Sequence, residues 1–322
     1  MAVGRSARGR EASPGERGDC LAVHEASTGR RAAEKICPDE GLRSARFTPD
    51  GQRVLMGTRG DRALLLDWHS DSVLARSQSA GDHIDEICWL PDGTRFVAAT
   101  RSNQVAVHDG ETLEVLHSLL PSDDEGPDRE VYEPFAGMAL SPPGRDGSAA
   151  RVFLASGLRV RCLDTDDGDL LWEAVLKQPA GCPTVSPDGS RLAVSSERGV
   201  TLLDAATGVV VATASCFRYR GVRFPGLPGG VGFSLRLAFS PDGQRLAAST
   251  PNGQLLLLDP VTLDLLREYP RQDGLAWIED LTWFADSCRL LVGCAHNRVL
   301  VWSVVQDRCL LESPLSRWPG WW

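Results

Sequence analysis

Short apolar runs of four to six residues recur along the chain, and a tight polar turn separates many of them. The tripeptide Pro-Asp-Gly occurs four times between runs that are rich in leucine or β-branched residues: Pro49–Gly51, Pro91–Gly93, Pro187–Gly189 and Pro241–Gly243. Proline presets φ for a turn, aspartate can bond its own backbone, and glycine accepts a positive φ. The pattern therefore predicts a repeated β-hairpin, and hence a repeated structural unit.

Alignment on this turn gives six complete units, which begin near Gly41, His83, Pro134, Gly181, Ser234 and Trp277. The turns are about 42 to 54 residues apart, which is typical of four-stranded propeller blades with loop insertions. The turns of the third and sixth units are degraded, to Pro142-Pro-Gly and Ala285-Asp-Ser. The third strand of a unit, such as Leu255–Leu258, lacks polar alternation, which predicts burial on both faces between neighbouring blades.

An aspartate follows the predicted third strand in five units: Asp67, Asp109, Asp164, Asp204 and Asp259. Each is expected to cap a turn, because acids from separate blades cannot converge on one metal ion. The order of strand, Ser-Pro-Asp-Gly, two strands, Asp and Thr-Gly resembles the WD-repeat β-propeller family over nearly the whole chain. Tryptophan of the family's signature dipeptide is replaced by residues such as Leu203 and His108, and His108 is expected to be a packed structural residue.

The resemblance implies an all-β fold, a β-propeller of four-stranded antiparallel blades, with seven blades as the commonest number. Residues 19–36 match a partial blade, residues 41–312 hold the six full blades, and residues 1–18 form a polar loop or tail. Residues 313–322 form a tryptophan-rich tail. Because closure removes exposed sheet edges, Trp318–Trp322 of this tail is expected to pack beside residues 1–37, so that both termini share the seventh blade. The alternative is a truncated chain, or a propeller that belongs to a larger signalling protein.

Composition narrows the classes of partner. The formal net charge is -9 and the isoelectric point is about 5.2, which argues against nucleic acid as a partner. No apolar run has the length of a membrane helix and no signal peptide is present, so we expect a cytoplasmic protein without membrane contact. The nine cysteines are scattered without any Cys-x-x-Cys pair, which favours a reducing compartment over a zinc site.

Two long insertions are the candidate binding segments, since loops that join one blade to the next carry function. The first contains the acids Asp123, Asp124, Glu125, Asp128 and Glu130; a solvated loop is the plain interpretation, and binding of a cation or a basic partner is the alternative. The second interleaves arginines with aromatic residues, which is typical of protein interfaces. Its candidate interface residues are Phe217, Arg218, Tyr219, Arg220, Arg223 and Phe224; alternatively, the aromatic rings anchor the loop and the arginines are solvated.

No nucleophile elbow, phosphate-binding loop or metal motif is present, and no residue is predicted to be catalytic, cofactor-binding or metal-binding. The sequence therefore predicts a non-enzymatic scaffold that binds one or more proteins through loops on one face. The segment Arg161–Trp172 also resembles a quinoprotein propeller repeat. A quinoprotein-like or lactonase-like enzyme or cofactor binder is accordingly the alternative function.

Overall fold

Every regular element that the structure describes is a β-strand. The structure is a computed structural model, and it describes residues 2–6, 20–25, 31–36, 41–70, 72–120, 135–142, 150–196, 199–215, 236–250, 253–269, 278–294 and 298–314. In this part of the chain, no helix has the length and apolar character needed to cross a membrane.

The strands form six antiparallel four-stranded sheets in chain order, which we call blades one to six. Blade one contains β4 (Leu42–Phe47), β5 (Arg53–Thr58), β6 (Ala63–Asp67) and β7 (Ser72–Arg76). Blade two contains β8 (Ile84–Trp89), β9 (Arg95–Thr100), β10 (Val105–Asp109) and β11 (Val115–Leu120). Blade three contains β12 (Phe135–Leu140), β13 (Arg151–Ser156), β14 (Arg159–Asp164) and β15 (Leu170–Val175).

The second half of the ring repeats the same order. Blade four contains β16 (Pro183–Val185), β17 (Arg191–Ser195), β18 (Val200–Asp204) and β19 (Val210–Ala214). Blade five contains β20 (Leu237–Phe239), β21 (Leu246–Ser249), β22 (Leu255–Leu258) and β23 (Leu265–Tyr269). Blade six contains β24 (Ile278–Trp283), β25 (Arg289–Cys294), β26 (Arg298–Ser303) and β27 (Arg308–Pro314).

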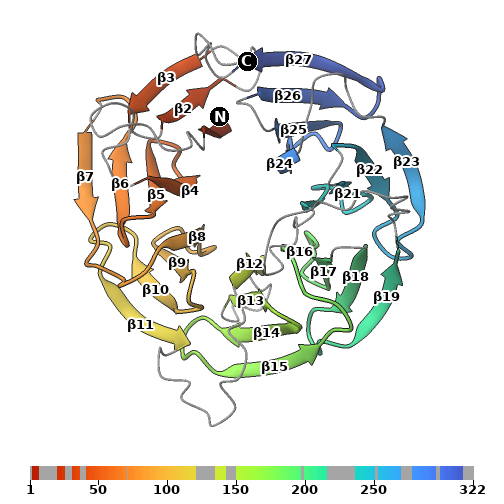
Figure 1. The fold of residues 1–322 in the computed structure, drawn as a ribbon, viewed down its shortest axis with the longest axis horizontal. Coiled ribbons are helices and arrows are strands. Elements are labelled where there is room, and N and C mark those ends of the chain that lie inside the picture. The colour runs from red at the N-terminus through yellow and green to blue at the C-terminus, as the bar shows by residue number, and fades with distance from the viewer. Residues whose placement is uncertain are drawn as a thin grey trace, which may run out of the picture.

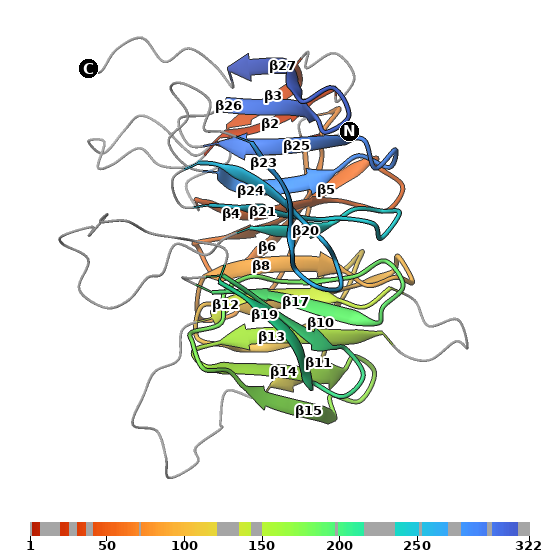
Figure 2. The same cartoon turned by 90° about the vertical axis from the view of Figure 1, so that its right-hand side faces the viewer.

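The sheets are arranged as a ring, with the first strand of each blade innermost and the fourth on the rim (Figure 1). Seen edge-on, the strands run across the thickness of the ring (Figure 2). The fold is therefore a β-propeller of four-stranded antiparallel blades, as the repeated turn predicted. The first strands of all six blades begin near the predicted positions.

A seventh, three-stranded sheet lies between blades one and six (Figure 1). It consists of β1 (Ala2–Ser6), β2 (Cys20–His24) and β3 (Arg31–Ile36), in that order. The expected partial blade is thus present, and these strands stand where the second, third and fourth strands stand in the other sheets. Six complete blades and one three-stranded sheet are what the described residues show. The proposed packing of Trp318–Trp322 beside this sheet lies outside the described residues.

The core consists of separate apolar layers between neighbouring sheets. In β6 and β22 every leucine is buried. In β18 of blade four, two adjacent leucines pack against opposite neighbours. Leu203 lies in one cluster with Phe153 of blade three, and Leu202 lies in another with Leu256 of blade five. A third strand is therefore covered on both faces, which explains why its sequence lacks alternation.

The repeated turns have the predicted chemistry. In blade four the backbone N–H of Ser190 donates to Asp188 Oδ1 at 3.0 Å, and Gly189 has a φ of +74°. At the end of the third strand, Asp204 Oδ1 accepts hydrogen bonds from the backbone N–H groups of Ala206 (3.2 Å) and Thr207 (3.0 Å). The same turn-capping role is found at the other four predicted acids: Asp67, Asp109, Asp164 and Asp259.

Blade six shows why one turn departs from the pattern. Ser287 stands where the other turns have glycine, and its φ is +53°. Its buried hydroxyl accepts a hydrogen bond from the backbone N–H of Asp242, in the turn of blade five, at 3.0 Å. Serine is strained at this positive φ where glycine would not be, but its hydroxyl forms a hydrogen bond between two blades.

Candidate functional site

Both loops that the sequence singled out lie outside the described residues. This applies to the acidic segment 123–130 and to the candidate interface residues Phe217, Arg218, Tyr219, Arg220, Arg223 and Phe224. Their roles remain predictions. The described residues instead bring together a set of charged and thiol side chains on, or directly before, the innermost strands. We call this set the central cluster: Arg46, Glu86, Cys88, Cys182, Arg236 and Asp280.

Most of the central cluster derives from one repeated position. Counted back from the first residue of the turn after each innermost strand, the fifth residue is Ser44, Glu86, Gly137, Cys182, Arg236 or Asp280. In blades one, two, three and six a β-bulge directly precedes this position. A bulge re-aims the side chain that follows it and is common next to functional sites. The propeller repeat therefore places six different residues at the equivalent place around one ring.

This position links each blade to the next in the first half of the ring. The backbone N–H of Ile87 in blade two donates to the hydroxyl of Ser44 in blade one, at 3.4 Å. One blade further, the backbone N–H of Met138 donates to Glu86 Oε2 at 2.9 Å. The same side-chain-to-backbone bond is thus made twice, first by a hydroxyl and then by a carboxylate.

Between blades three and four this bond has neither an acceptor nor a donor. Gly137 has no side chain that could accept, and the residue at the donor position is Pro183, which has no N–H. A Cβ added to Gly137 would lie only 3.0 Å from Pro183 Cδ and 3.2 Å from Cys182 Cα. The two residues therefore fit together, because neither leaves an unsatisfied polar group and glycine leaves room for the proline ring.

In the second half of the ring, Arg236 connects three blades. Its Nη1 donates to Cys182 Sγ of blade four at 2.7 Å, and its Nε donates to the carbonyl oxygen of Glu279 in blade six at 2.7 Å. The Cys182 sulfur, followed by the carboxylates of Asp280 and Glu86, raises the pKa of Arg236. The guanidinium is therefore held in place by fixed partners on both sides.

The charges of the cluster act on one another across the ring. Arg46 Nη2 of blade one lies 3.6 Å from Glu86 Oε1 of blade two. Enclosure by protein atoms raises the pKa of Glu86, and the charges of Arg46 and Arg236 partly offset this effect. Solvent still reaches the cluster, since the side chain of Arg46 is 42% exposed and that of Glu86 is 22% exposed. Two positive and two negative side chains thus face solvent from blades one, two, five and six.

The two thiols of the cluster are not activated nucleophiles. Burial raises the pKa of Cys88 to about 12, and the negative charge of Glu86 adds to this effect. Burial also raises the pKa of Cys182, although Arg236 opposes the shift. A thiol with a raised pKa is protonated at neutral pH and reacts slowly. The cluster can therefore donate and accept hydrogen bonds and pair with charges, but its cysteines are poor nucleophiles.

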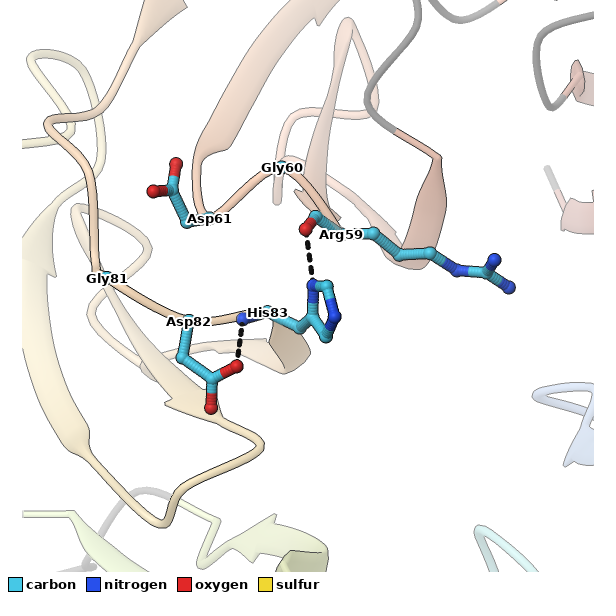
Figure 3. Close-up of a pocket in the computed structure, with 6 residues that line it drawn as sticks. All are labelled: Arg59, Gly60, Asp61, Gly81, Asp82 and His83. Carbon is cyan, nitrogen blue, oxygen red and sulfur yellow. Dashed lines mark hydrogen bonds between the residues drawn. The ribbon is translucent and has the colours of Figure 1, made fainter.

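A shallow hollow on the side of the ring where the innermost strands begin is a second candidate (Figure 3). It lies between the β5–β6 turn and the segment before β8, and it is lined by Arg59, Gly60, Asp61, Gly81, Asp82 and His83. His83 Nδ1 contacts the carbonyl oxygen of Arg59, and Asp82 Oδ2 accepts from the backbone N–H of Ser102 at 2.8 Å. These contacts hold the junction of blades one and two, so we assign the hollow a structural role.

Two further predictions can be compared with the structure. His108 is 6% exposed and stacks on Phe96 with a ring-centroid distance of 4.8 Å, as expected for a packed residue. Trp172, from the unit that resembles a quinoprotein repeat, donates from Nε1 to the carbonyl oxygen of Ala205 in blade four at 3.1 Å. It therefore joins two blades.

Among the described residues, no group of three or more His, Cys, Asp or Glu side chains could hold a metal ion.

The sequence contained a signal for the central cluster that the search for contiguous motifs missed. Glu86 in β8, Asp280 in β24 and Arg236 directly before β20 are charged residues at one fixed distance from the turn that follows. Charged residues at the same position of several repeats are expected to face one another in a ring. No known protein family matches the chain, and no curated protein is similar to it.

Proposed function

We propose that this chain is a non-enzymatic protein-interaction scaffold with the architecture of a WD-repeat propeller. A partner protein binds on the face at which the innermost strands begin. The observation that carries the proposal is the central cluster, in which charged side chains of both signs reach solvent from four blades. A rigid set of fixed charges recognises a partner by electrostatic complementarity.

The connections of the chain support the choice of this face. Residues 121–134 connect β11 to β12, and residues 216–235 connect β19 to β20. Each of these long segments leads directly into an innermost strand of the site: Arg236 follows the second one, and Met138, whose N–H binds Glu86, follows the first closely. The six candidate interface residues, between Phe217 and Phe224, thus belong to a segment that leads to Arg236 of the cluster.

The redox state of the cysteines agrees with a cytoplasmic scaffold. Cysteines of four blades are free thiols: Cys88, Cys162, Cys182 and Cys288. No described feature favours the alternative of a quinoprotein-like or lactonase-like enzyme, because the cluster contains no histidine and its thiols are protonated. A reducing cytoplasmic location forms part of the same proposal.

The test removes charge from the cluster without removing its hydrogen bonds. In the double variant Arg46→Gln/Asp280→Asn, the amide of residue 280 can still accept from the backbone N–H of Leu281, as Asp280 Oδ1 does at 3.0 Å. The matched control is Arg267→Gln/Asp307→Asn, which removes an arginine and an aspartate that pair between blades five and six on the rim. Both variants change the same number of charges.

Wild type and both variants are immobilised and exposed to a native extract under chemical cross-linking, and captured proteins are identified and purified. We expect a protein that binds wild type and the rim variant with equal affinity, and that binds the cluster variant at least about tenfold more weakly. Equal binding by all three forms would contradict the location of the site. Failure of wild type to retain any protein would contradict the scaffold function itself.

A further inference from the structure

Blades two and six have two adjacent acids at the same place in the repeat. Asp85 and Glu86 in β8, and Glu279 and Asp280 in β24, are the sixth and fifth residues before the turn that follows the innermost strand. In both strands the pairing register shifts at the first of the two acids, which marks a β-bulge. The same local structure therefore presents a pair of carboxylates at two places on the ring, and the surroundings of the two pairs can be compared directly.

The acids of blade two are paired within the molecule. Arg43 Nε lies 3.0 Å from Asp85 Oδ1, and Arg46 Nη2 lies 3.6 Å from Glu86 Oε1. Both arginines belong to β4, the innermost strand of the preceding blade. Blade one thus supplies one arginine for each acid of blade two.

The acids of blade six have no such arginines. At the two positions that hold arginine in blade one, blade five has Leu235 and Ala238. Glu279 and Asp280 are both exposed, and neither forms an ion pair with a residue that the structure describes. Asp280 Oδ1 accepts a hydrogen bond from the backbone N–H of Leu281 at 3.0 Å. Two adjacent carboxylates therefore face solvent without a direct cationic partner.

The arginine that blade five does contribute is held by uncharged acceptors. Arg236 Nη1 donates to Cys182 Sγ at 2.7 Å, and Nε donates to the backbone carbonyl oxygen of Glu279, not to its carboxylate, at 2.7 Å. Arg236 and Asp280 interact electrostatically, but they form no ion pair. This junction has one positive and two negative side chains, so one negative charge remains uncompensated.

We propose that the partner protein presents an arginine side chain to Glu279 and Asp280, in the role that Arg43 and Arg46 have at blade two. The proposal rests on the proposed function, because these acids lie on the same face of the ring. Arginine fits the site, since its planar guanidinium forms paired hydrogen bonds with carboxylates. The contact between blades one and two shows that this bulge accepts guanidinium groups.

The experiment uses random linear peptides displayed on phage as the probe and immobilised wild type as the target. We expect the selected peptides to share an arginine and to bind Glu279→Gln/Asp280→Asn at least about tenfold more weakly than wild type. Both substitutions keep an oxygen that can accept hydrogen bonds, so they remove charge alone. Replacement of the shared arginine by glutamine in a selected peptide should have the same effect.

The matched control is Asp166→Asn/Asp169→Asn, which removes two exposed carboxylates from the turn after β14. This turn lies at the end of the blade where the innermost strand finishes, because β14 runs parallel to β12. The control variant should bind the selected peptides as wild type does. Equal weakening in both double variants would show that the peptides respond to net charge and would overturn the proposal.

A second variant fills the site from within. Ala238→Arg places an arginine at the position of Arg46 in blade one, and we expect it to weaken peptide binding at least about tenfold, whereas Ala238→Gln should not. Circular dichroism verifies folding, since Ala238 packs partly against the core; if Ala238→Arg does not fold, the exposed Glu279→Gln/Asp280→Asn variant decides.

The outcomes separate this proposal from the scaffold function. Selected peptides without a shared arginine, or unchanged binding in Glu279→Gln/Asp280→Asn or in folded Ala238→Arg, would overturn the assignment of the arginine site. The peptide library contains no native partner, so the native extract tests the scaffold function separately. A native partner that loses affinity in Arg46→Gln but not in Glu279→Gln/Asp280→Asn would preserve the scaffold function and contradict this site.

Discussion

Single carboxylates hold the turns of this propeller, and Asp204 illustrates how. Its Oδ1 accepts from two backbone N–H groups and from the Thr207 hydroxyl at 2.9 Å, and its Oδ2 lies 3.1 Å from Arg191 Nη1. We expect Asp204→Ala to lower the free energy of unfolding by about 1 kcal/mol, because the turn loses its acceptor. Urea denaturation measures the effect. Asp204→Asn keeps the acceptor and loses the charge, so it should lower the free energy of unfolding by less than Asp204→Ala does. Equal decreases in the two variants would show that the ion pair with Arg191, and not the turn, determines the effect.

The buried imidazole of His108 makes stability depend on pH. Burial lowers the pKa of His108 below its ordinary value of 6.5, against the opposing effect of the Leu113 carbonyl oxygen. The unfolded chain then binds a proton more readily than the folded chain, so the contribution to stability is complete above pH 6.5 and is lost as the pH falls through the folded pKa.

Replacement of this imidazole isolates its contribution. His108→Phe keeps an aromatic ring against Phe96, and we expect it to reduce the fall in unfolding free energy between pH 7 and pH 5, by at most about 1.4 kcal/mol per pH unit. Urea titrations at several pH values provide the measurement. Parallel profiles for wild type and His108→Phe would contradict the assignment.

At the scale of the element, the turn of blade six combines strain with a bond to the neighbouring blade. Both Ser287→Ala and Ser287→Gly remove the acceptor for the Asp242 N–H, but only glycine relieves the positive φ of this residue. We expect both to destabilise the protein, with alanine worse than glycine by about 0.5 to 1 kcal/mol. Thermal unfolding gives the ranking. If alanine were the less damaging change, backbone strain at this turn would be excluded as a factor.

The elements show what sequence can and cannot predict. Strands and turns were predictable because their signals are local: the Pro-Asp-Gly turn needs three adjacent residues, and a third strand such as β22 needs one apolar run. The link between Gly137 and Pro183 joins two blades, so neither residue alone indicates it. The central cluster is harder still, since Glu86 and Arg236 are separated by 150 positions and meet only when the ring closes. Prediction of such a site requires that repeat positions be aligned before motifs are sought.

At the scale of the whole molecule, the N-terminal sheet is part of the ring's core and not an appendage. Val23 of β2 is 1% exposed and packs in one cluster with Leu42, Val54 and Met56 of blade one. In a ring of sheets each apolar layer needs both neighbours, so the loss of one contact exposes the face of the adjacent blade to water. The three strands of residues 2–36 should therefore contribute to the cooperative unfolding of blade one.

Val23→Asp tests this dependence. A carboxylate in that layer has no partner for its charge, and we expect it to lower the free energy of unfolding by about 3 kcal/mol. The control is Ala32→Asp in β3 of the same sheet, where residue 32 is exposed and the change should stay within about 0.5 kcal/mol. Urea unfolding is followed by tryptophan fluorescence, to which Trp68 of blade one contributes, and by circular dichroism, which reports on all sheets. If Val23→Asp unfolds at a lower urea concentration than wild type, with the same midpoint by fluorescence and by circular dichroism, the N-terminal sheet and blade one unfold together. An unchanged midpoint would mean that the N-terminal sheet folds and unfolds apart from the ring.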